Sequence, residues 1–201
     1  MPKLLLATNN KGKVREYKNL LLDLDYQLVT LAEAGITTSV EESGKTMEEN
    51  ARLKATAFAA ESNLLSMADD SGLEVDILGG EPGLFSARYA GEGASDAERI
   101  NYLLVKLKDI PREKRSAQFR CVIAIAIPKG EVRICTGICR GFITSDPRGS
   151  RGFGYDPIFY FPEYDRTMAE LPLALKNRVS HRARAAEQAR QVLEELHDRA
   201  F

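Results

Sequence analysis

Apolar and polar residues follow one another along the chain in blocks that predict strands and helices. A short apolar run at residues 3–7 predicts a buried strand. After a polar loop, apolar residues recur at helical spacing, namely Val14, Tyr17, Leu20, Leu21 and Leu24. Residues 27–31 have the pattern of a second strand, and residues 33–44 that of a polar loop. The beginning of the chain therefore predicts a strand, a tight loop, a helix and another strand.

Two later helices begin with the same signature, a hydroxyl residue followed three positions later by a glutamate. Thr46 and Glu49 form such a capping box and open an alanine-rich helix that runs to about Ser62. Ser95 and Glu98 form the second, and apolar residues at positions 100, 103, 104 and 107 continue the helix behind it. A last helix is predicted from Ser180, which is a good cap residue.

The remaining apolar segments predict strands. Residues 64–68 indicate a buried strand that ends on Asp69-Asp70-Ser71-Gly72, and a long loop is expected from there to Gly93, with only residues 73–77 extended. Residues 116–127 alternate with period two and, across a turn, lead into residues 132–146, which predicts a long antiparallel hairpin. A glycine-rich loop at 149–156 precedes a short strand at 158–161. The fold class expected is α/β, a mixed twisted sheet with helices around it, in one domain over residues 1–201.

Composition narrows the class of protein. The chain has 201 residues, of which 44% are hydrophobic and 28% charged, as in ordinary globular proteins. The formal net charge of −1 argues against a nucleic acid as main partner. The longest apolar stretch, residues 121–127, is too short to cross a membrane, and the N-terminal run is too short for a signal peptide, so a cytoplasmic protein is expected. Three scattered cysteines predict reduced core residues, and two histidines disfavour a zinc site.

The segment from Ala7 to Val14 has the features of a phosphate-binding loop. It places small polar residues and a lysine between a strand and a helix N-terminus, where backbone N–H groups and the helix dipole favour a phosphate. It differs from a Walker A loop at Ala7, where a glycine belongs, and at Val14, where a hydroxyl residue would hold magnesium. The alternative is an ordinary strand-to-helix turn with surface lysines.

Asp69 and Asp70 follow an apolar strand directly, and ligands of open α/β sheets are commonly bound at strand ends. Mg²⁺ prefers one or two carboxylates together with waters and substrate phosphate oxygens. Asp70 with an acid from another loop, Glu41 or Glu42, would be sufficient. The alternative is an Asx turn or a loop cap.

Two later segments carry groups that suit a nucleobase. Glycines at 152 and 154 would let Phe153 lie flat against a planar base, although the same residue also suits a place in the core. Near the start of the last helix, donor-bearing side chains gather within seven positions: Lys176, Asn177, Ser180, His181 and Arg182. They suit an anion and the edge of a base, but a solvated basic face is the alternative, since further arginines accompany them.

In this order and spacing, the motifs closely resemble those of the inosine triphosphate pyrophosphatase family. They are Ala7-Thr8-Asn9-Asn10-Lys11-Gly12-Lys13, Glu49-Asn50-Ala51 with Lys54-Ala55, Asp69-Asp70-Ser71-Gly72-Leu73, Leu78-Gly79-Gly80 with Pro82-Gly83, Ser86-Ala87-Arg88-Tyr89, Gly152-Phe153-Gly154-Tyr155-Asp156-Pro157 and Ser180-His181-Arg182. The resemblance spans nearly the whole chain. It implies an elongated fold with two lobes around a central substrate cleft. It also implies a hydrolase that converts ITP, dITP and XTP to the monophosphate and pyrophosphate, and so keeps them out of DNA and RNA.

The resemblance also implies roles for individual residues. Asp70 corresponds to the general base and a metal-linked carboxylate, Glu42 to the second acid near Mg²⁺, and Ser71 to a residue that touches substrate. The triphosphate-binding loop corresponds to Thr8, Asn9, Asn10, Lys11, Gly12 and Lys13. Phe153 corresponds to the aromatic that stacks on the purine, in a loop with Gly154, Tyr155 and Asp156, while Lys176, His181 and Arg182 correspond to residues around the base edge and phosphates. A homodimer is implied as well.

Three other functions compete with this interpretation. A nucleic-acid-binding module would use the basic segment 176–190, against which the overall charge counts. A P-loop phosphotransferase is disfavoured by Val14. A pyrophosphatase of related fold that acts on modified pyrimidines is the third. For purines, donors from His181 or Arg182 would match a 6-oxo group and leave adenine badly paired, whereas exclusion of guanine requires rejection of its 2-amino group.

Overall fold

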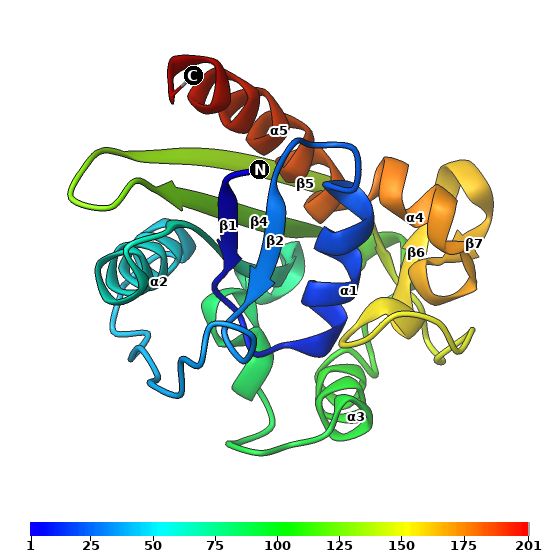
Figure 1. Ribbon diagram of the computed structural model, residues 1–201. Coiled ribbons are helices and arrows are strands. Elements are labelled where there is room, and N and C mark those ends of the chain that lie inside the picture. The colour runs from blue at the N-terminus through cyan, green and yellow to red at the C-terminus, as the bar shows by residue number, and fades with distance from the viewer. Residues whose placement is uncertain (201) are drawn as a thin grey trace. The chain divides into compact units, whose positions relative to one another are not determined.

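The computed structural model describes residues 1–200, and side chains as far as residue 198. It is a mixed α/β fold in which seven strands form one sheet in the order β2-β1-β3-β4-β5-β6-β7 (Figure 1). The strands are β1 (Lys3–Leu6), β2 (Gln27–Thr30), β3 (Leu65–Val75), β4 (Ser116–Ala126), β5 (Val132–Ile143), β6 (Phe159–Phe161) and β7 (Arg166–Thr167). β1 pairs in parallel with β2 and β3, whereas β6 pairs antiparallel with β5 and β7.

Helices connect these strands. The α-helices are α1 (Lys11–Leu20), α2 (Met47–Ser62), α3 (Asp96–Lys106), α4 (Leu173–Val179) and α5 (His181–Ala200). Short 3₁₀ helices are η1 (Asp76–Leu78), η2 (Gly83–Arg88), η3 (Arg112–Lys114), η4 (Asp156–Ile158), η5 (Pro162–Tyr164) and η6 (Met168–Glu170). None of the helices described here has the length and apolar character needed to span a membrane.

The chain divides into two compact units. Unit 1 comprises residues 1–70, 121–137 and 182–201, and unit 2 comprises residues 71–120 and 138–181. Three strands, β3, β4 and β5, contribute residues to both units.

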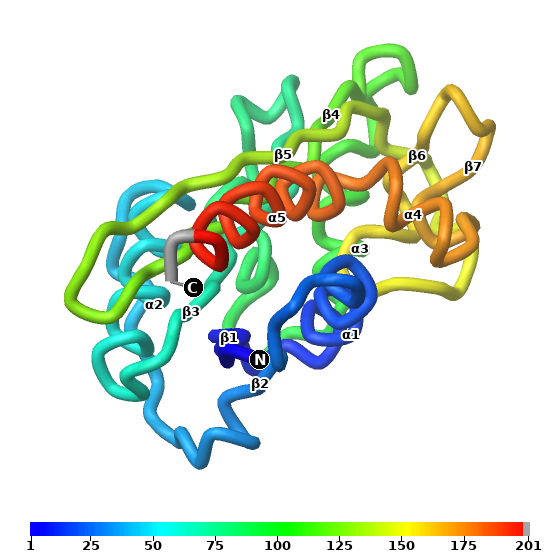
Figure 2. Tube along the Cα trace, turned by 45° about the horizontal axis from the view of Figure 1, so that its top comes forward, coloured from blue at the N-terminus to red at the C-terminus, as the bar shows by residue number. Residues whose placement is uncertain are grey.

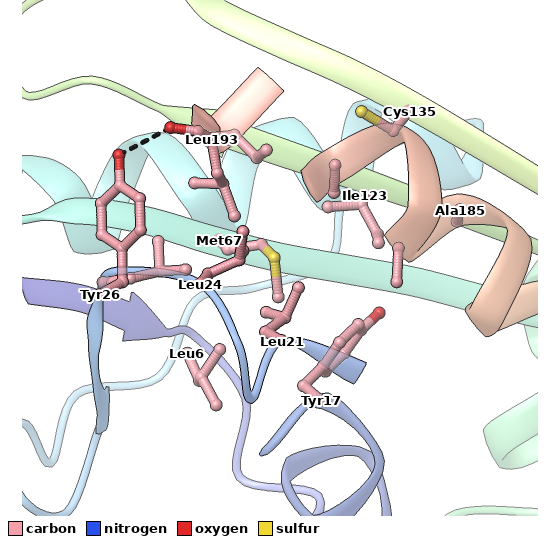
Figure 3. Packing of buried hydrophobic residues seen from close by; sticks show 14 of the residues in the cluster. Leu6, Tyr17, Leu21, Leu24, Tyr26, Met67, Ile123, Cys135, Ala185 and Leu193 are labelled. Atoms are coloured by element: carbon pink, nitrogen blue, oxygen red, sulfur yellow. Dashed lines mark hydrogen bonds between the residues drawn. The ribbon is translucent and has the colours of Figure 1, made fainter. Parts of the chain in front are cut away.

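The core of unit 1 is formed by β1, α1, α5 and the adjoining parts of β3, β4 and β5. Its buried side chains include Leu6, Tyr17, Met67, Ile123 and Leu193. Figure 3 shows these side chains converging from several elements, with the Tyr26 hydroxyl donating to the carbonyl oxygen of Leu193 at 2.9 Å. In unit 1, α5 runs along β5 (Figure 2), where the Gln188 side chain exchanges hydrogen bonds with the backbone of Thr136.

The core of unit 2 packs around aromatic side chains. Phe119, Phe159 and Phe161 are buried with Leu73 and Leu103. The rings of Phe119 and Phe159 lie with centroids 4.5 Å apart. Burial of aromatic rings contributes strongly to stability because each removes a large apolar area from water. This core supports the glycine-rich loop that precedes η4.

Much of the predicted pattern is confirmed. The Ser95 capping box is complete, since Ser95 Oγ accepts from Glu98 N while Glu98 accepts from Ser95 N. At α2, Thr46 caps the helix as predicted, but Glu49 reaches back to the amide of Lys45. β4 and β5 form the expected hairpin, joined by a turn at residues 127–131.

Three sequence predictions are wrong. The strand expected to stop before Asp69 continues to Val75, so both aspartates lie inside β3. The reason is that the extended segment 73–77 joins the strand without a break through Gly72, and burial in the sheet outweighs the turn propensity of Asp and Gly. The loop expected to follow contains η1 and η2, and α4 was missed because its seven residues are too few for a helical period to show.

Candidate active site

The loop that begins α1 is held by its own polar side chains. Asn10 is the N-cap, and its Oδ1 accepts from the amides of Gly12 at 2.9 Å and Lys13 at 3.1 Å. The hydroxyl of Thr8 accepts from the amide of Asn10 at 3.2 Å. Asparagine is among the most favourable N-cap residues. The backbone N–H groups of Gly12 and Lys13, which the sequence predicts to be available for a phosphate, are therefore occupied by the cap in this structure.

Asp69 lies in a buried network of charges in unit 1. Its Oδ2 is 3.0 Å from Lys13 Nζ and 3.6 Å from Arg182 Nη2. Arg182 is buried and donates to Glu16 Oε2 at 2.6 Å, and Glu16 is buried as well. Burial acts to raise the pKa of Asp69, but Lys13, Arg182 and Lys54 together hold it at about 2. Asp69 is thus a permanent anion that fixes two cations.

The Asp70 side chain contacts other residues than the Asp69 side chain does. Asn50 Nδ2 donates to its Oδ2 at 3.4 Å, and Lys54 Nζ lies 3.9 Å from its Oδ1. The same ammonium donates to Glu42 Oε1 at 2.5 Å. Burial raises the pKa of Asp70 above its usual value, and the nearby anions Glu42 and Asp69 add to this, against the opposing effect of Lys54 and Lys13. Asp70 therefore binds a proton more readily than an ordinary aspartate.

Alternation along β3 separates the two carboxylates. Successive side chains of a strand point to opposite faces, so Asp69 contacts Lys13 and Arg182 from α1 and α5, whereas Asp70 contacts Asn50 and Lys54 from α2. The prediction that both stand at a strand end is corrected by this mid-strand position, which gives each carboxylate its own surroundings.

Asn50 holds the acidic loop beside Asp70. Its Oδ1 accepts from the amide of Gly44 at 2.8 Å, while its Nδ2 donates to Asp70. A Cβ at position 44 would lie 2.6 Å from Asn50 Oδ1, so only glycine permits this approach. The contact keeps residues 41–44 near α2. Glu42 joins the cluster through Lys54, whereas Glu41 is exposed.

The residues around Asp70 fit a magnesium ion. The ammonium of Lys54 stands between the carboxylates of Glu42 and Asp70, which shows that a cation is favoured there. No group of three His, Cys, Asp or Glu side chains with the arrangement of a metal site occurs among the described residues. Two carboxylates suit Mg²⁺, which takes its other ligands from water and phosphate. Oδ1 of the neighbouring Asp69 is buried and accepts no hydrogen bond within the described part of the chain.

In unit 2, Asp156 shapes the loop that carries Phe153. Its Oδ2 accepts from the amide of Phe153 at 3.0 Å and from Lys176 Nζ at 2.6 Å. The Asp156–Lys176 pair is buried. Lys176 Nζ also lies 5.1 Å from the centroid of the Phe153 ring, within range of a cation–π contact. Gly152 has φ +80°, and a Cβ there would be 2.0 Å from Asp156 Oδ2. The tight turn therefore requires glycine.

His181 and Tyr155 are fixed by the core of unit 2. The His181 ring stacks on Phe119, with centroids 4.6 Å apart and an angle of 15° between the planes. Its Nδ1 is 3.9 Å from Cys139 Sγ. Tyr155 is buried, and its hydroxyl donates to the carbonyl oxygen of Ser86 at 2.9 Å. The side chain of Tyr155 therefore attaches the glycine-rich loop to the core of unit 2.

A cavity of about 610 Å³ lies along the exposed side of α1 in unit 1. Thr8, Asn9 and Lys11 line it from the predicted phosphate loop, and Arg15 and Leu31 line it further along. Lys13 is on the opposite side of the helix, where it meets Asp69. Part of the predicted loop thus borders a cavity and part points into the buried charge network.

The predicted residues form two groups. In unit 1 the structure brings together Asp70 and Glu42, and separately Lys13 and Arg182 around Asp69. In unit 2 it brings together Phe153, Gly154, Tyr155, Asp156 and Lys176, while His181 lies on Phe119. Ser71 belongs to unit 2 by its position in the chain.

Sequence reasoning missed Glu16 altogether, and it gave no role to Asn50 and Lys54, although both stand in the quoted motifs. For Glu16 the available signal is its place on α1 four positions before Leu20, a residue of the apolar series that packs against the core. A glutamate on a buried face requires a cationic partner. Asn50 and Lys54 are four positions apart on α2, so both reach the same side of that helix.

Comparison with known proteins adds independent information. The chain is 48% identical to a dITP/XTP pyrophosphatase from Bacillus subtilis, over 96% of this chain and 98% of that protein. It is 50% identical to a dITP/XTP pyrophosphatase from Geobacter sulfurreducens, over 92% and 93%. Among solved structures, a HAM1 protein from Coxiella burnetii has a TM-score of 0.88 at 44% identity and covers 97% of this chain and 100% of its own. The Staphylococcus aureus Ham1 protein has a TM-score of 0.86 at 44% identity, over 96% and 98%.

The family model described as the Ham1 family matches residues 4–192, which include every residue of the two groups described above. Because that match and the relatives both extend over nearly the whole length, the chain belongs to the Ham1 family.

Proposed function

We propose that the chain hydrolyses the non-canonical purine nucleoside triphosphates ITP, dITP and XTP to the monophosphate and pyrophosphate, and thereby removes them from the nucleotide pool. The observation that carries the proposal is the meeting of the Asp70 and Glu42 carboxylates at one ammonium group, Lys54 Nζ, in unit 1. Relatives named dITP/XTP pyrophosphatase, with 48% and 50% identity, support the same reaction. A carboxylate pair can hold a divalent cation against the phosphates, and a carboxylate can act as the base that activates water.

Mg²⁺ is the proposed cofactor, and Asp70 and Glu42 are the residues that would hold it. When bound, the ion would neutralise negative charge on the phosphate oxygens. Asp70 also orients a water molecule and accepts its proton. Its raised pKa suits this task, because a base is most effective when its pKa lies closer to the working pH.

In the proposed reaction the water oxygen forms a bond to the α-phosphorus, and the bond from that phosphorus to the bridging oxygen breaks. Pyrophosphate leaves with the electron pair of that bond. The segment Thr8 to Lys13 binds the triphosphate, and Lys13 stabilises the leaving group electrostatically. Arg182 neutralises Asp69 together with Lys13, so it supports this end of the substrate from within the buried network.

Residues of unit 2 bind the base in this proposal. Phe153 stacks on the purine. Asp156, Lys176, the backbone amide of Gly154 and the hydroxyl of Tyr155 hold the stacking loop. His181 donates to the 6-oxo group of the base. Phe119 stacks on the imidazole ring and holds its plane in the orientation for this contact. Adenine carries an amino donor at that position, so it leaves the histidine badly paired and is rejected. Ser71 contacts the substrate.

The domain organisation, the oligomeric state and the location in the cell are proposed from the resemblance to the family. The chain acts as one domain over residues 1–201 and as a homodimer, which sedimentation of the purified protein would test. The cytoplasm is the proposed location. The three buried, unbridged cysteines agree with a reducing compartment.

The proposed function is tested by measuring pyrophosphate release from ITP, XTP, GTP, ATP and a pyrimidine triphosphate, each with and without Mg²⁺. We expect rapid release from ITP and XTP, slow release from the others, and dependence on the metal. Equal rates on all five substrates would contradict the proposed base recognition. Faster release from the pyrimidine triphosphate would show that the substrate is a pyrimidine nucleotide.

A further inference from the structure

A carboxylate at the start of α3 holds the backbone of the loop that carries Phe153. Oδ2 of Asp96 accepts from the amide of Gly154 at 2.7 Å. Asp96 is the first residue of α3 and lies 58 positions before Gly154 in the chain. Both residues belong to unit 2. A hydrogen bond to an ionised acceptor is stronger than one between neutral groups, so this contact is well suited to fix a backbone amide.

Arg99 fixes the carboxylate in turn. Its guanidinium donates to Asp96 Oδ1, to the carbonyl oxygen of Ala87 at 2.8 Å and to that of Ala94 at 2.6 Å. The capping box of Ser95 and Glu98 holds the same turn of helix. Asp96 is therefore attached at one oxygen to a rigid helix start and at the other to the loop.

The loop is held at the two peptide groups that flank Phe153. The amide of Phe153 belongs to the preceding peptide and donates to Asp156 Oδ2, whereas the amide of Gly154 belongs to the following peptide and donates to Asp96 Oδ2. Because each peptide group is planar, fixing both planes fixes the backbone angles φ and ψ of the residue between them. Two carboxylates from different parts of the chain thus set the direction in which the Phe153 side chain leaves the backbone.

We propose that Asp96 is a positioning residue for nucleobase recognition, which acts by orienting Phe153 for stacking on the purine. The inference rests on the proposed function, because it assigns that ring to the base. Stacking requires the ring plane to match the plane of the base, and pre-orientation avoids the entropic cost of ordering the loop on binding. Asp96 itself touches neither the base nor the phosphates in this proposal.

The test compares Asp96→Ala with Glu98→Ala as a matched control. Both variants damage the N-terminus of α3, but the described side-chain hydrogen bonds of Glu98 go to Ser95, whereas those of Asp96 go to Arg99 and Gly154. We expect Asp96→Ala to raise KM for ITP about tenfold, because a ring that is no longer held in orientation loses much of its stacking contribution to base binding. Its kcat and the inhibition constant of inorganic tripolyphosphate should stay close to wild type. Glu98→Ala should lower the melting temperature similarly and leave KM unchanged.

Two further measurements decide whether Asp96 acts through Phe153. Amide hydrogen exchange should be faster at Gly154 in Asp96→Ala than in Glu98→Ala. The variant Asp96→Asn keeps an acceptor oxygen, so its KM for ITP should lie much closer to the wild-type value than that of Asp96→Ala. In the Phe153→Ala background, Asp96→Ala should add little to KM, because a residue that acts through the ring has no effect without it.

The experiments distinguish failure of the proposed function from failure of the positioning role of Asp96. If the wild-type chain releases no pyrophosphate from ITP, the proposed function is wrong. If the wild type is active but Asp96→Ala has the KM of Glu98→Ala, or if its effect is fully additive with Phe153→Ala, the positioning role is wrong while the proposed function stands. A rise in KM that accompanies an equal rise in the tripolyphosphate inhibition constant would also overturn it, since the damage would then extend beyond base binding.

Discussion

At the scale of single residues, the pKa values of two neighbouring aspartates are shifted in opposite directions. Lys13 and Arg182 hold the pKa of Asp69 at about 2 despite its burial, whereas burial and nearby anions raise the pKa of Asp70. Environments that push two pKa values apart commonly divide the chemical roles between two acids. Asp69 is suited to permanent charge compensation, and Asp70 to proton transfer.

Replacement of Asp70 by asparagine tests this division. Asp70→Asn should lower kcat for ITP by about 10²–10⁴-fold, as expected for the loss of a general base. It should leave the fold intact, because the amide has the same shape and removes a buried charge. Pyrophosphate release and the thermal midpoint measure the two effects. Full activity in the variant would remove Asp70 from the mechanism.

Phe153 gives a second prediction at this scale. Phe153→Ala should raise KM for purine triphosphates by about tenfold, because stacking on a base contributes ~1–3 kcal/mol. The inhibition constant of inorganic tripolyphosphate, which has no base, should change little. Inhibition kinetics with both ligands measure this difference. Equal changes would mean that the ring supports the core instead of the base.

At the scale of elements, three short segments complete a candidate site whose other residues lie on regular strands and helices. The start of α1 is shaped by the Asn10 cap, the loop before α2 by Asn50, and the segment before η4 by Asp156. Each of these side chains binds backbone amides, which is how polar residues stabilise turns against competing conformations. The regular strands and helices hold the ends of these segments in place.

The turn at Gly152 allows a direct test of one such segment. Gly152→Ala should destabilise the protein by about 1–3 kcal/mol, because alanine is strained at φ +80° and its Cβ would collide with Asp156 Oδ2. Gly154→Ala is the matched control, since φ is +62° but no described atom lies within 4 Å of a Cβ there. Denaturant unfolding should show the smaller loss for Gly154→Ala. The opposite order would contradict the packing described for the turn.

At the scale of the molecule, buried ionisable groups link folding to pH. The three cysteines are buried, and burial raises the pKa of Cys135 from 9.0 to about 11. Above pH 9 the unfolded chain loses this proton while the folded chain keeps it. Stability from the neutral thiol is therefore complete below pH 9 and is lost as the pH rises toward 11.

Urea unfolding between pH 8 and pH 11 measures this linkage. The free energy of unfolding should fall with rising pH in the wild type and should fall less steeply in Cys135→Ala. The variant should be less stable at pH 8 because a core side chain is truncated, but the comparison concerns the slope. Identical slopes in both proteins would show that Cys135 does not contribute to the dependence.

Local rules were sufficient for several features whose interacting groups are close in the chain. The capping box of Ser95 and Glu98, the hairpin of β4 and β5 and the burial of the cysteines are confirmed, because spacing and hydrophobicity determine them. The strand end expected at Asp69 failed because partners elsewhere in the sheet extend β3 through a sequence that favours turns.

By itself, the sequence determined most of the longer strands and helices in their order and the chemical types of the candidate residues, since these depend on neighbours within a few positions. Only the tertiary structure decided which charges meet. Arg182 pairs with Glu16 across 166 positions, Lys176 with Asp156 across 20, and Asp96 with the amide of Gly154 across 58. Such pairings depend on the packing of whole elements, and no local period in the sequence records them.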